Sequence, residues 1–599
     1  MNILLTAINA KYIHSNLAVY SLRACAGEYR DAVELAEYTI NNQKDYILEE
    51  LYKRKPDVLC FSCYIWNIDY VTDIAREYKK LCPSVPIWVG GPEVSYEVET
   101  FLRENPYIDG VMIGEGEDTF RELCGYYAHK RKLSDIAGIA FRKYSTGNST
   151  SNRTSVNNAG CKADEIVFTS PRPIKNMSEI PFCYDTLDDF SNRIIYYESS
   201  RGCPFSCSYC LSSVDKTLRF RDTEIVKREL KFFIDQKVPQ IKFVDRTFNC
   251  NHAHAMELWR FIKANDNGVT NFHFEISADL LNQEELELIS DMRPGLIQLE
   301  IGVQSTNEVT IKEIHRTMKL ERLKEVVKLI QSGNNIHEHL DLIAGLPYED
   351  YDSFGRSFDE IYELKPNQLQ LGFLKVLKGS YMFEHATEYG IVYHDKPPYE
   401  VMSTKWLSFD DVIKIKRVED MLEVYYNSGQ FEITMKLMEC IFDSAFEFFQ
   451  ELGDFYEANG YFGMSHSRIR RCEILLEFMA LYLHCCDSDD TDFDENAQLY
   501  SMIQESLIFD LYYRENCKSR PVWATDIGSF KHMTHAYCKN GKLSHVEPFH
   551  YIFPDKHTRK LDELPKYHKE PVWALFHYDM RDPLDHQALV EYVDRSKAI

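Results

Sequence analysis

The sequence predicts an α/β protein of several domains, in which two βα regions precede a mostly helical region. Residues 1–140 alternate short apolar strands, Gly-rich turns and helices, a pattern typical of an open parallel sheet. A second βα rhythm occupies residues 191–390, and aromatic-rich helical periodicity replaces it after about residue 395. The 599 residues, 44% of them hydrophobic, are enough to fill several cores.

Composition narrows the classes of function. A formal net charge of −25 disfavours broad, non-specific nucleic-acid binding, which depends on neutralising phosphates. No apolar run reaches the roughly 20 residues that span a bilayer, so we expect no membrane association. Met1–Ala7 lacks a basic leader and predicts a first strand. Seventeen cysteines without an export signal indicate reduced thiols in the cytoplasm.

Two Gly-rich turns mark the N-terminal region, residues 1–140. They are Gly90-Gly91-Pro92-Glu93 and Gly114-Glu115-Gly116-Glu117, each directly after an expected strand. Ligands of open parallel sheets bind beyond the carboxyl ends of the strands, and a missing Cβ lets the backbone approach a ligand closely. We expect strands at Met1–Ile8, Asp57–Tyr64, Ile87–Val89 and Gly110–Ile113, and helices at Asn16–Gly27, Tyr70–Leu81 and Thr119–Tyr127.

A connector follows at residues 141–190. Ile139–Arg142 and Ile166–Ser170 predict the strands of a hairpin, with a loop rich in Ser, Thr and Asn at Tyr144–Ala163. Pro171, Pro173 and Pro181 then predict an extended linker.

The second βα region, residues 191–390, predicts a partial (β/α)6 barrel. In barrels of this kind the functional groups lie at the C-terminal ends of the strands. The expected strands are Ile194–Ser199, Gln240–Asp245, Phe272–Ala278, Leu296–Gln304, His337–Ala344 and Gln368–Val376. The expected helices are Glu224–Gln236, Ala253–Ala264, Glu284–Met292, Leu320–Ser332 and Tyr351–Leu364.

Three cysteines follow the first of these strands. Cys203, Cys207 and Cys210 have C-x3-C-x2-C spacing beside Gly202 and Pro204. A cubane iron–sulfur cluster usually takes four thiolates, so three leave one iron open. The alternative is buried thiols or a zinc site, but zinc needs a fourth ligand and no Cys or His follows until Cys250.

The segment Arg201–Cys210, with Tyr209 before the third cysteine, resembles the radical S-adenosylmethionine (SAM) superfamily. The resemblance implies a 4Fe-4S cluster whose open iron is chelated by SAM. It also implies reductive cleavage of SAM to a 5′-deoxyadenosyl radical, with electrons from an external donor such as flavodoxin or ferredoxin.

The two Gly-rich turns resemble those of the cobalamin-binding domain that precedes many radical SAM enzymes. The alternative is that their glycines only make tight turns in a flavodoxin-like fold. The resemblance implies that cobalamin is held by Gly90, Gly91, Pro92, Glu93, Gly114, Glu115 and Gly116.

The resemblance also assigns SAM contacts to strand ends. Asp245 stands where other radical SAM proteins carry Gly-Gly-Glu, which receives the SAM amino group, and Glu275 is a further candidate. Gln304 and Ser305 would bind the ribose or carboxylate, and Ile343 lies in an apolar stretch that suits the adenine. Arg316 is interpreted as a solvated helix residue, with a SAM contact as the alternative.

Two features of the N-terminal region argue against metal ligands there. Many cobalamin domains present a cobalt ligand in an Asp-x-His-x-x-Gly loop, and the segment around His14 lacks the Asp and Gly. We therefore expect no protein ligand below cobalt, and His14 as a hydrogen-bonding loop residue. Cys60 and Cys63 lie within one expected strand, where residues three apart point to opposite faces, so they are interpreted as buried thiols.

Residues 391–599 predict a mostly helical domain. It resembles an uncharacterised domain that follows some cobalamin-binding radical SAM proteins. It is expected to cover the open side of the barrel and contact substrate, or else only to pack. The expected helices are Asp410–Tyr426, Ile433–Glu451 and Arg468–Cys485, followed by an acidic loop at Asp487–Glu495 and a basic, partly strand-like stretch from Tyr512 to Lys569.

Together the resemblances imply a cobalamin-dependent radical SAM enzyme. The first hypothesis is a methyltransferase that acts on an unactivated carbon through the 5′-deoxyadenosyl radical and methylcobalamin. The alternatives are a non-methylating rearrangement or cyclisation with the same cofactors, and a non-catalytic cobalamin or redox sensor. The acidic balance favours a small-molecule or peptide substrate, while the basic C-terminal stretch keeps tRNA as a second hypothesis.

Overall fold

The computed structural model describes residues 1–143, 165–485, 493–528, 531–538, 543–554 and 558–593. Two compact units make up the chain. The first contains residues 1–280 with two later segments, 314–317 and 374–402. The second contains residues 281–313, 318–373 and 403–599. The expected loop Tyr144–Ala163 and residues 486–492 lie outside the described residues.

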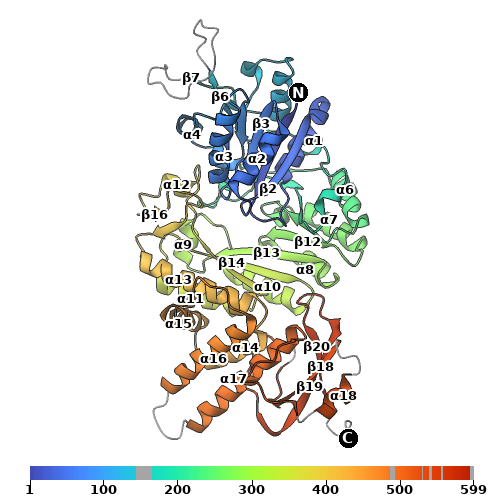
Figure 1. Ribbon diagram of the computed structural model, residues 1–599, viewed down its shortest axis with the longest axis vertical. Coiled ribbons are helices and arrows are strands. Elements are labelled where there is room, and N and C mark those ends of the chain that lie inside the picture. The colour runs from blue at the N-terminus through green and yellow to red at the C-terminus, as the bar shows by residue number, and fades with distance from the viewer. Residues whose placement is uncertain (144–164, 486–492, 529–530, 539–542, 555–557, 594–599) are drawn as a thin grey trace. The chain divides into compact units, whose positions relative to one another are not determined.

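The first unit begins with a seven-stranded sheet of order β2-β1-β3-β4-β5-β6-β7 (Figure 1). The first five strands are parallel, while β6 and β7 form the expected antiparallel hairpin. The strands are β1 (Ile3–Asn9), β2 (Val33–Thr39), β3 (Val58–Ser62), β4 (Ile87–Gly90), β5 (Gly110–Met112), β6 (Ile139–Lys143) and β7 (Glu165–Phe168). The helices are α1 (Leu17–Cys25), α2 (Lys44–Arg54), α3 (Ile68–Leu81), α4 (Val98–Glu104) and α5 (Glu117–Tyr127).

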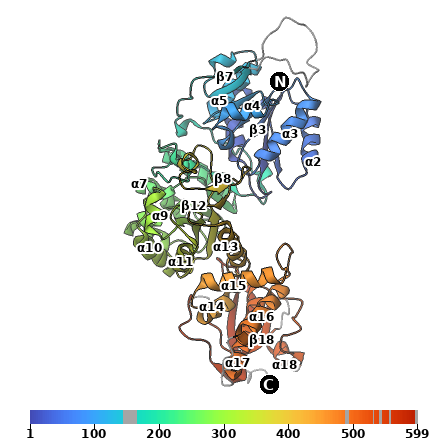
Figure 2. The ribbon, with the colours of Figure 1, turned by 90° about the vertical axis from the view of Figure 1, so that its left-hand side faces the viewer.

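Helices cover both faces of this sheet. Every residue of β1 is buried, as expected for a parallel strand that is covered on two sides. The helices α2 and α3 lie side by side (Figure 2), and α1 packs against α5. The strand order 2-1-3-4-5 is flavodoxin-like and reverses between β1 and β3, where such sheets bind ligands. The expected N-terminal elements are present, but β2, α2 and α4 were not expected from the sequence.

The second sheet has six strands in the order β15-β14-β13-β12-β11-β8. The strands that belong to the first unit are β8 (Ile195–Tyr197), β11 (Gln240–Phe243) and β12 (Asn271–Ile276), with α6 (Thr223–Asp235) and α7 (His252–Ala264). The strands that belong to the second unit are β13 (Ile297–Gln304), β14 (His337–Ala344) and β15 (Gln368–Phe373). Its helices here are α8 (Gln283–Ser290), α9 (Glu308–Glu313), α10 (Leu320–Ser332) and α11 (Tyr351–Tyr362). All six expected strands are present, and the pairs within each unit are parallel.

The strands of the second unit are apolar on one face only. In β13 the side chains of Leu299, Ile301 and Val303 are fully buried and alternate with partly exposed Gln298 and Glu300. The helix α11, whose apolar face is buried, packs on β14. Alternation with period two therefore sets which face of the strands is covered by helices.

Short elements complete the first unit. A two-residue antiparallel ladder joins β9 (Ser200–Arg201) to β10 (Arg219–Phe220). Later in the chain come α12 (Tyr381–Glu384), β16 (Val392–Tyr393) and β17 (Val401–Ser403).

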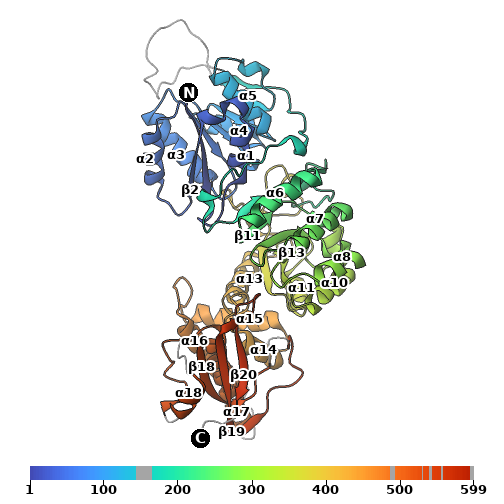
Figure 3. The ribbon, with the colours of Figure 1, turned by 90° about the vertical axis from the view of Figure 1, so that its right-hand side faces the viewer.

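The C-terminal region combines helices with a three-stranded antiparallel sheet of order β18-β19-β20. The helix α17 lies beside β18 (Figure 3). The helices are α13 (Phe409–Met421), α14 (Glu432–Ile441), α15 (Ala445–Ala458), α16 (Arg468–Cys485), α17 (Phe493–Arg514) and α18 (Lys531–Tyr537), and the strands are β18 (Ser544–Tyr551), β19 (Tyr567–Arg581) and β20 (Ala588–Val593). Within the described residues no helix combines the length and the apolar character that crossing a bilayer requires.

Two C-terminal expectations were wrong in detail. The single helix expected at Ile433–Glu451 breaks into α14 and α15, because the Ser444 side chain accepts a hydrogen bond from the Glu447 N–H and starts a new helix. The end of the expected acidic loop, Phe493–Glu495, is instead the first turn of α17.

A π-helical turn at Leu422–Asn427 protects the edge strand β15. The Asn427 side chain accepts from the Leu369 N–H at 2.9 Å and donates to the Leu369 carbonyl at 2.8 Å. One side-chain amide thus replaces a neighbouring strand at the edge of the sheet, where unpaired backbone groups invite further strand pairing. π-helical turns are rare, and here the turn places an amide against a strand.

We predict that Asn427→Ala exposes this edge. Removing the amide leaves the Leu369 N–H and C=O without their partner, at a cost of about 1–3 kcal/mol. Hydrogen exchange followed by mass spectrometry should show faster exchange in the peptide that contains Leu369. Asn459→Ala is the control, because Asn459 caps the exposed end of α15. Unchanged exchange at Leu369 in Asn427→Ala would contradict the capping role.

Candidate functional site

The three-cysteine segment is the loop that connects β9 to β10. Arg201 and Arg219 face each other across this short ladder, at the base of the loop. Gly202 begins the loop with φ of +91°, and a Cβ there would lie 2.6 Å from the Thr217 carbonyl oxygen. Only glycine fits that backbone, because both the dihedral angle and the contact exclude a side chain.

The three cysteines are close together and largely covered. Cys203 and Cys207 are each 8% exposed, and Cys210 is half-buried. Burial raises the pKa of the Cys203 thiol, and negative charge on Cys210 and Cys207 raises it further. Such mutual repulsion between thiolates is relieved when cationic iron binds them, so this donor set fits an iron–sulfur cluster. In the described part of the chain, no three Cys, His, Asp or Glu side chains are close enough together to bind one metal ion. A cubane cluster does not need such a group, because each thiolate binds a different iron atom.

Two distant segments hold the middle of the cysteine loop. The Ser208 N–H donates to the Ile314 carbonyl, and the Ser208 carbonyl accepts from the Met382 N–H, both at 2.9 Å. Arg316 lies 3.9 Å from the Cys207 sulfur and donates to the Tyr209 hydroxyl at 3.2 Å. The interpretation of Arg316 as a solvated helix residue was therefore wrong. It lies in the segment between α9 and α10, where its charge faces the Cys207 sulfur.

Asp245 lies just beyond β11 and is fully buried. Its carboxylate accepts from the Ser199 N–H at 2.9 Å and from the Ser199 and Ser200 hydroxyls at 2.6 Å each. Burial raises the pKa of Asp245 to about 6, although these hydrogen bonds lower it. In this conformation Asp245 fixes the residues that lead into the cysteine loop. Its contact with the SAM amino group stays a prediction.

The other expected SAM contacts lie at strand ends. In the first unit, Glu275 is the penultimate residue of β12 and is half-buried. In the second unit, Gln304 ends β13 with φ of +78°, and Ile343 is the penultimate residue of β14. Ser305 is fully buried and donates to Glu349 at 2.6 Å. Their contacts with SAM also stay predictions.

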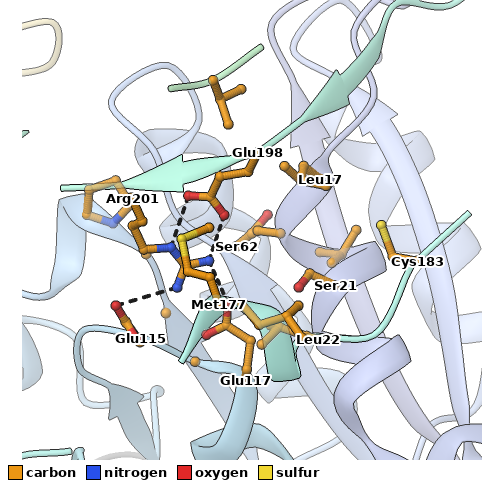
Figure 4. A pocket seen from close by; sticks show the side chains of 18 of the residues that line it. Leu17, Ser21, Leu22, Ser62, Glu115, Glu117, Met177, Cys183, Glu198 and Arg201 are labelled. Atoms are coloured by element: carbon orange, nitrogen blue, oxygen red, sulfur yellow. Dashed lines mark hydrogen bonds and ion pairs between the residues drawn. The ribbon is translucent and has the colours of Figure 1, made fainter. Parts of the chain in front are cut away.

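A cavity of about 590 Å3 lies within the first unit. Its walls come from the C-terminal edge of the first sheet, from the connector and from the base of the cysteine loop (Figure 4). The volume falls within the roughly 300–1,000 Å3 that is usual for cofactor and ligand pockets. The lining includes Gly90, Gly91, Pro92, Gly114, Glu115 and Gly116 on one side, and Arg201, Gly202, Asp215 and Arg246 on the other.

The glycines of both turns shape this cavity. A Cβ on Gly91, where φ is +121°, would lie 2.4 Å from the Cys63 carbonyl oxygen. A Cβ on Gly114, where φ is +75°, would meet nothing within 4 Å, so the backbone there faces open space. The two turns therefore let a bulky ligand come close to the backbone, as a corrin cofactor would need to do.

Glu93 departs from the expected cobalamin contacts. It is absent from the cavity lining and instead accepts a hydrogen bond from the Tyr399 hydroxyl. Burial raises the pKa of Glu93. The residue therefore ties the first Gly-rich turn to the segment 374–402.

An ion-pair bundle joins the second Gly-rich turn to the base of the cysteine loop. Arg201 pairs with Glu198 at 2.7 Å and with Glu117 at 2.8 Å. Glu115 lies 3.5 Å from Arg201 and 2.6 Å from Arg219. Figure 4 shows these carboxylates converging on the Arg201 guanidinium at the cavity wall.

The sequence reading missed several cavity residues. Arg201 and Arg219 flank the cysteines in the sequence, and the turn Gly114–Glu117 is acidic. This combination could have predicted the ion pairs, because guanidinium groups bind carboxylates well. The lining from α1 and from the connector carries no comparable signal, because it is largely apolar and includes Leu17, Leu22, Met177, Ile180 and Phe182.

His14 Nδ1 and the Tyr196 hydroxyl share a hydrogen bond of 2.7 Å, so His14 has the hydrogen-bonding role expected for it. Burial lowers the pKa of His14. Among the described residues, those lining the cavity include no histidine. Cys60 and Cys63 are fully buried, and burial raises the pKa of both thiols.

Three family models match successive parts of the chain. Residues 3–124 match the B12 binding domain, residues 197–361 the radical SAM superfamily, and residues 387–588 a protein family of unknown function, DUF4080.

Among curated proteins, the chain is 28% identical over 364 residues to the cobalamin-dependent radical SAM methyltransferase TokK of Streptomyces tokunonensis, covering 57% of this chain and 49% of that protein. It is 26% identical over 325 residues to a 2-(S-pantetheinyl)-carbapenam-3-carboxylate methyltransferase of Streptantibioticus cattleyicolor, covering 51% and 45%. The chain thus spans about half the length of these relatives.

Solved structures share the fold. The cobalamin-dependent S-adenosylmethionine radical enzyme OxsB with aqua-cobalamin bound has a TM-score of 0.57 at 15% identity, covering 85% of this chain and 80% of OxsB. The chain therefore carries a B12-binding domain, a radical SAM domain and a DUF4080 domain, in that order, and is related to cobalamin-dependent radical SAM proteins.

Proposed function

We propose that this protein is a cobalamin-dependent radical SAM enzyme that methylates an unactivated carbon. The observation that carries the proposal is the cavity of the first unit, because one wall belongs to the B12-binding domain and the opposite wall to the base of the cluster loop. When bound, SAM and cobalamin supply a radical initiator and a methyl donor, and the protein supplies position and shelter.

The residues of the chain have three tasks in this proposal. Cys203, Cys207 and Cys210 hold the cluster in a loop whose base is clamped and whose middle is tied to Ile314 and Met382. The Gly-rich turns let a corrin approach the backbone. The connector covers the cavity and limits the entry of water, which would otherwise meet a reactive carbon radical.

Several similar curated proteins favour methyl transfer over the alternatives. Two of them are named methyltransferases, as described above, and a third is an uncharacterised methyltransferase of Pyrococcus horikoshii at 24% identity. A specific observation keeps cyclisation as a second candidate. The chain is 22% identical over 357 residues to an anaerobic magnesium-protoporphyrin IX monomethyl ester cyclase of Rubrivivax gelatinosus. A small-molecule or peptide substrate and an external electron donor are part of the proposal.

SAM with an isotopically labelled methyl group separates these functions. We expect the label in a product that is 14 mass units heavier than its precursor, plus the label, as a methyl group replaces hydrogen. Extracts of the source cells can serve as the substrate pool, and mass spectrometry gives the readout. Deoxyadenosine formed with an unlabelled product would favour cyclisation or rearrangement. Intact SAM under reducing conditions would favour the sensor.

The cluster cysteines have a direct test. Replacing Cys203, Cys207 and Cys210 together with Ala should remove the cluster iron and abolish cleavage of SAM to 5′-deoxyadenosine. Iron content and chromatography measure both effects. Cys60→Ala together with Cys63→Ala is the matched control, because these thiols are buried in and just after β3, within the first sheet. Wild-type iron in the triple variant would refute the assignment.

Cobalamin should bind without a histidine ligand from the protein. The side chain of His14 is held by Tyr196, and no histidine lines the cavity among the described residues. The electron paramagnetic resonance spectrum of the Co(II) form should lack nitrogen hyperfine splitting, and His14→Ala should leave it unchanged. Nitrogen coupling that disappears in His14→Ala would show that the prediction is wrong.

A further inference from the structure

We infer that Arg201 is a positioning residue that couples occupancy of the cobalamin cavity to order in the cluster loop. This inference rests on the two cofactor assignments of the proposed function but not on the transfer of methyl. It concerns the ion-pair bundle formed by Arg201, Arg219, Glu115, Glu117 and Glu198.

At the base of the loop, a carboxylate from the first sheet bridges two arginines that face each other. Arg201 and Arg219 are directly opposite in a two-residue antiparallel ladder. Like charges in that position repel and would open the ladder. Glu115 Oε1 lies 3.5 Å from one guanidinium and 2.6 Å from the other, so one carboxylate bridges the two like charges. Asp215 adds a contact to Arg219 at 3.0 Å from within the loop itself.

The carboxylate comes from a part of the chain that ligand binding would move. Glu115 lies between Gly114 and Gly116, which both line the cavity. Gly114 has φ of +75° with open space beside it, so a group that fills the cavity can press directly on the backbone of this turn. Glu117 follows the turn as the first residue of α5 and is only 7% exposed where it meets Arg201.

The ion pairs are placed to transmit such a shift. Arg201 is 22% exposed, so solvent screens it only in part, and its fork contacts three carboxylates at once. The connector joins the same bundle, since the Lys175 N–H donates to Glu115 at 3.2 Å and the Lys175 carbonyl accepts from Arg219 at 3.4 Å. A change in the turn therefore reaches residue 201, which is two positions before Cys203.

Coupling between two sites is reciprocal in binding free energy. A ligand that fills the cavity and orders the turn also orders the base of the loop. Conversely, a cluster that orders the loop strengthens ligand binding in the cavity. The protein should therefore bind cobalamin more tightly when it carries its cluster, by about fivefold or more.

Equilibrium dialysis under anaerobic conditions, with hydroxocobalamin as the probe and cobalt measured in each chamber, tests this. The dissociation constant is determined for protein with a reconstituted cluster and for protein stripped of iron. The wild-type ratio should be about five or more, and Arg201→Gln should bring it close to one. Arg228→Gln is the control, because Arg228 is exposed on α6 outside the cavity lining and should keep the wild-type ratio.

A purely structural role for Arg201 would lower thermal stability in both forms and leave the ratio unchanged. Arg201→Lys keeps the positive charge but loses the planar guanidinium that contacts several carboxylates at once, so it should keep only part of the wild-type coupling. Glu115→Gln leaves both arginines in place and carries the same expectation as Arg201→Gln, so a folding defect in one variant does not decide the outcome. The rate at which a chelator removes iron should also fall when cobalamin is bound, in wild type and in Arg228→Gln but not in Arg201→Gln.

The inference fails if the wild-type ratio is one, or if either variant that loads its cluster keeps the wild-type ratio. These results are separate from methyl transfer. A protein that couples its cofactors but yields no methylated product would refute the methyltransferase and leave the coupling intact. A wild-type ratio of one would refute the coupling and leave methyl transfer open to its own test.

Discussion

The shared carboxylate of Glu115 is the interaction on which the cofactor region depends. The cluster loop closes on a ladder of only two residues per strand, with two arginines opposed. Closing a flexible loop costs entropy, and a charge-repelling base adds to that cost. The B12-binding domain offsets both by supplying Glu115 and Glu117. The first domain is therefore part of the scaffold of the cysteine loop as well as a binding module.

The rest of the loop is tied down by backbone contacts from far along the chain. Ser208 bonds to residues 314 and 382, while Ser199 and Ser200 are fixed by the buried Asp245. None of these partners is near the cysteines in sequence. The arrangement explains why the first unit includes two short segments, 314–317 and 374–402, that are separated from its main body.

Strand ends and glycine turns were the predictable part of this protein, since period-two apolar runs and Gly-rich turns depend on local chemistry. The six barrel strands and the two turns follow from that signal. The strand β2 was missed because Glu34 and Glu37 interrupt its apolar pattern, and the structure shows Glu37 taken up by Arg193 and Tyr20.

Side-chain partners were less predictable than elements. Arg316 reads as an ordinary helix residue, and only the turn after α9 brings it to Cys207. Asp245 is at the predicted strand end, but its carboxylate turns back to the serines of the neighbouring strand end. Such choices depend on pairings between remote segments, which periodicity in one segment does not encode.

The connector has a consequence for how long a cofactor stays. Met177 and Phe182 line the cavity, and Arg221 pins the same stretch by donating to the Met177 and Ile180 carbonyls. Arg221 is itself held by buried Glu229. A group in the cavity is thus enclosed by the chain that links its two binding domains. If the proposed cobalamin occupies this cavity, it can leave only when the connector opens, and we expect faster release from a fragment that lacks the connector.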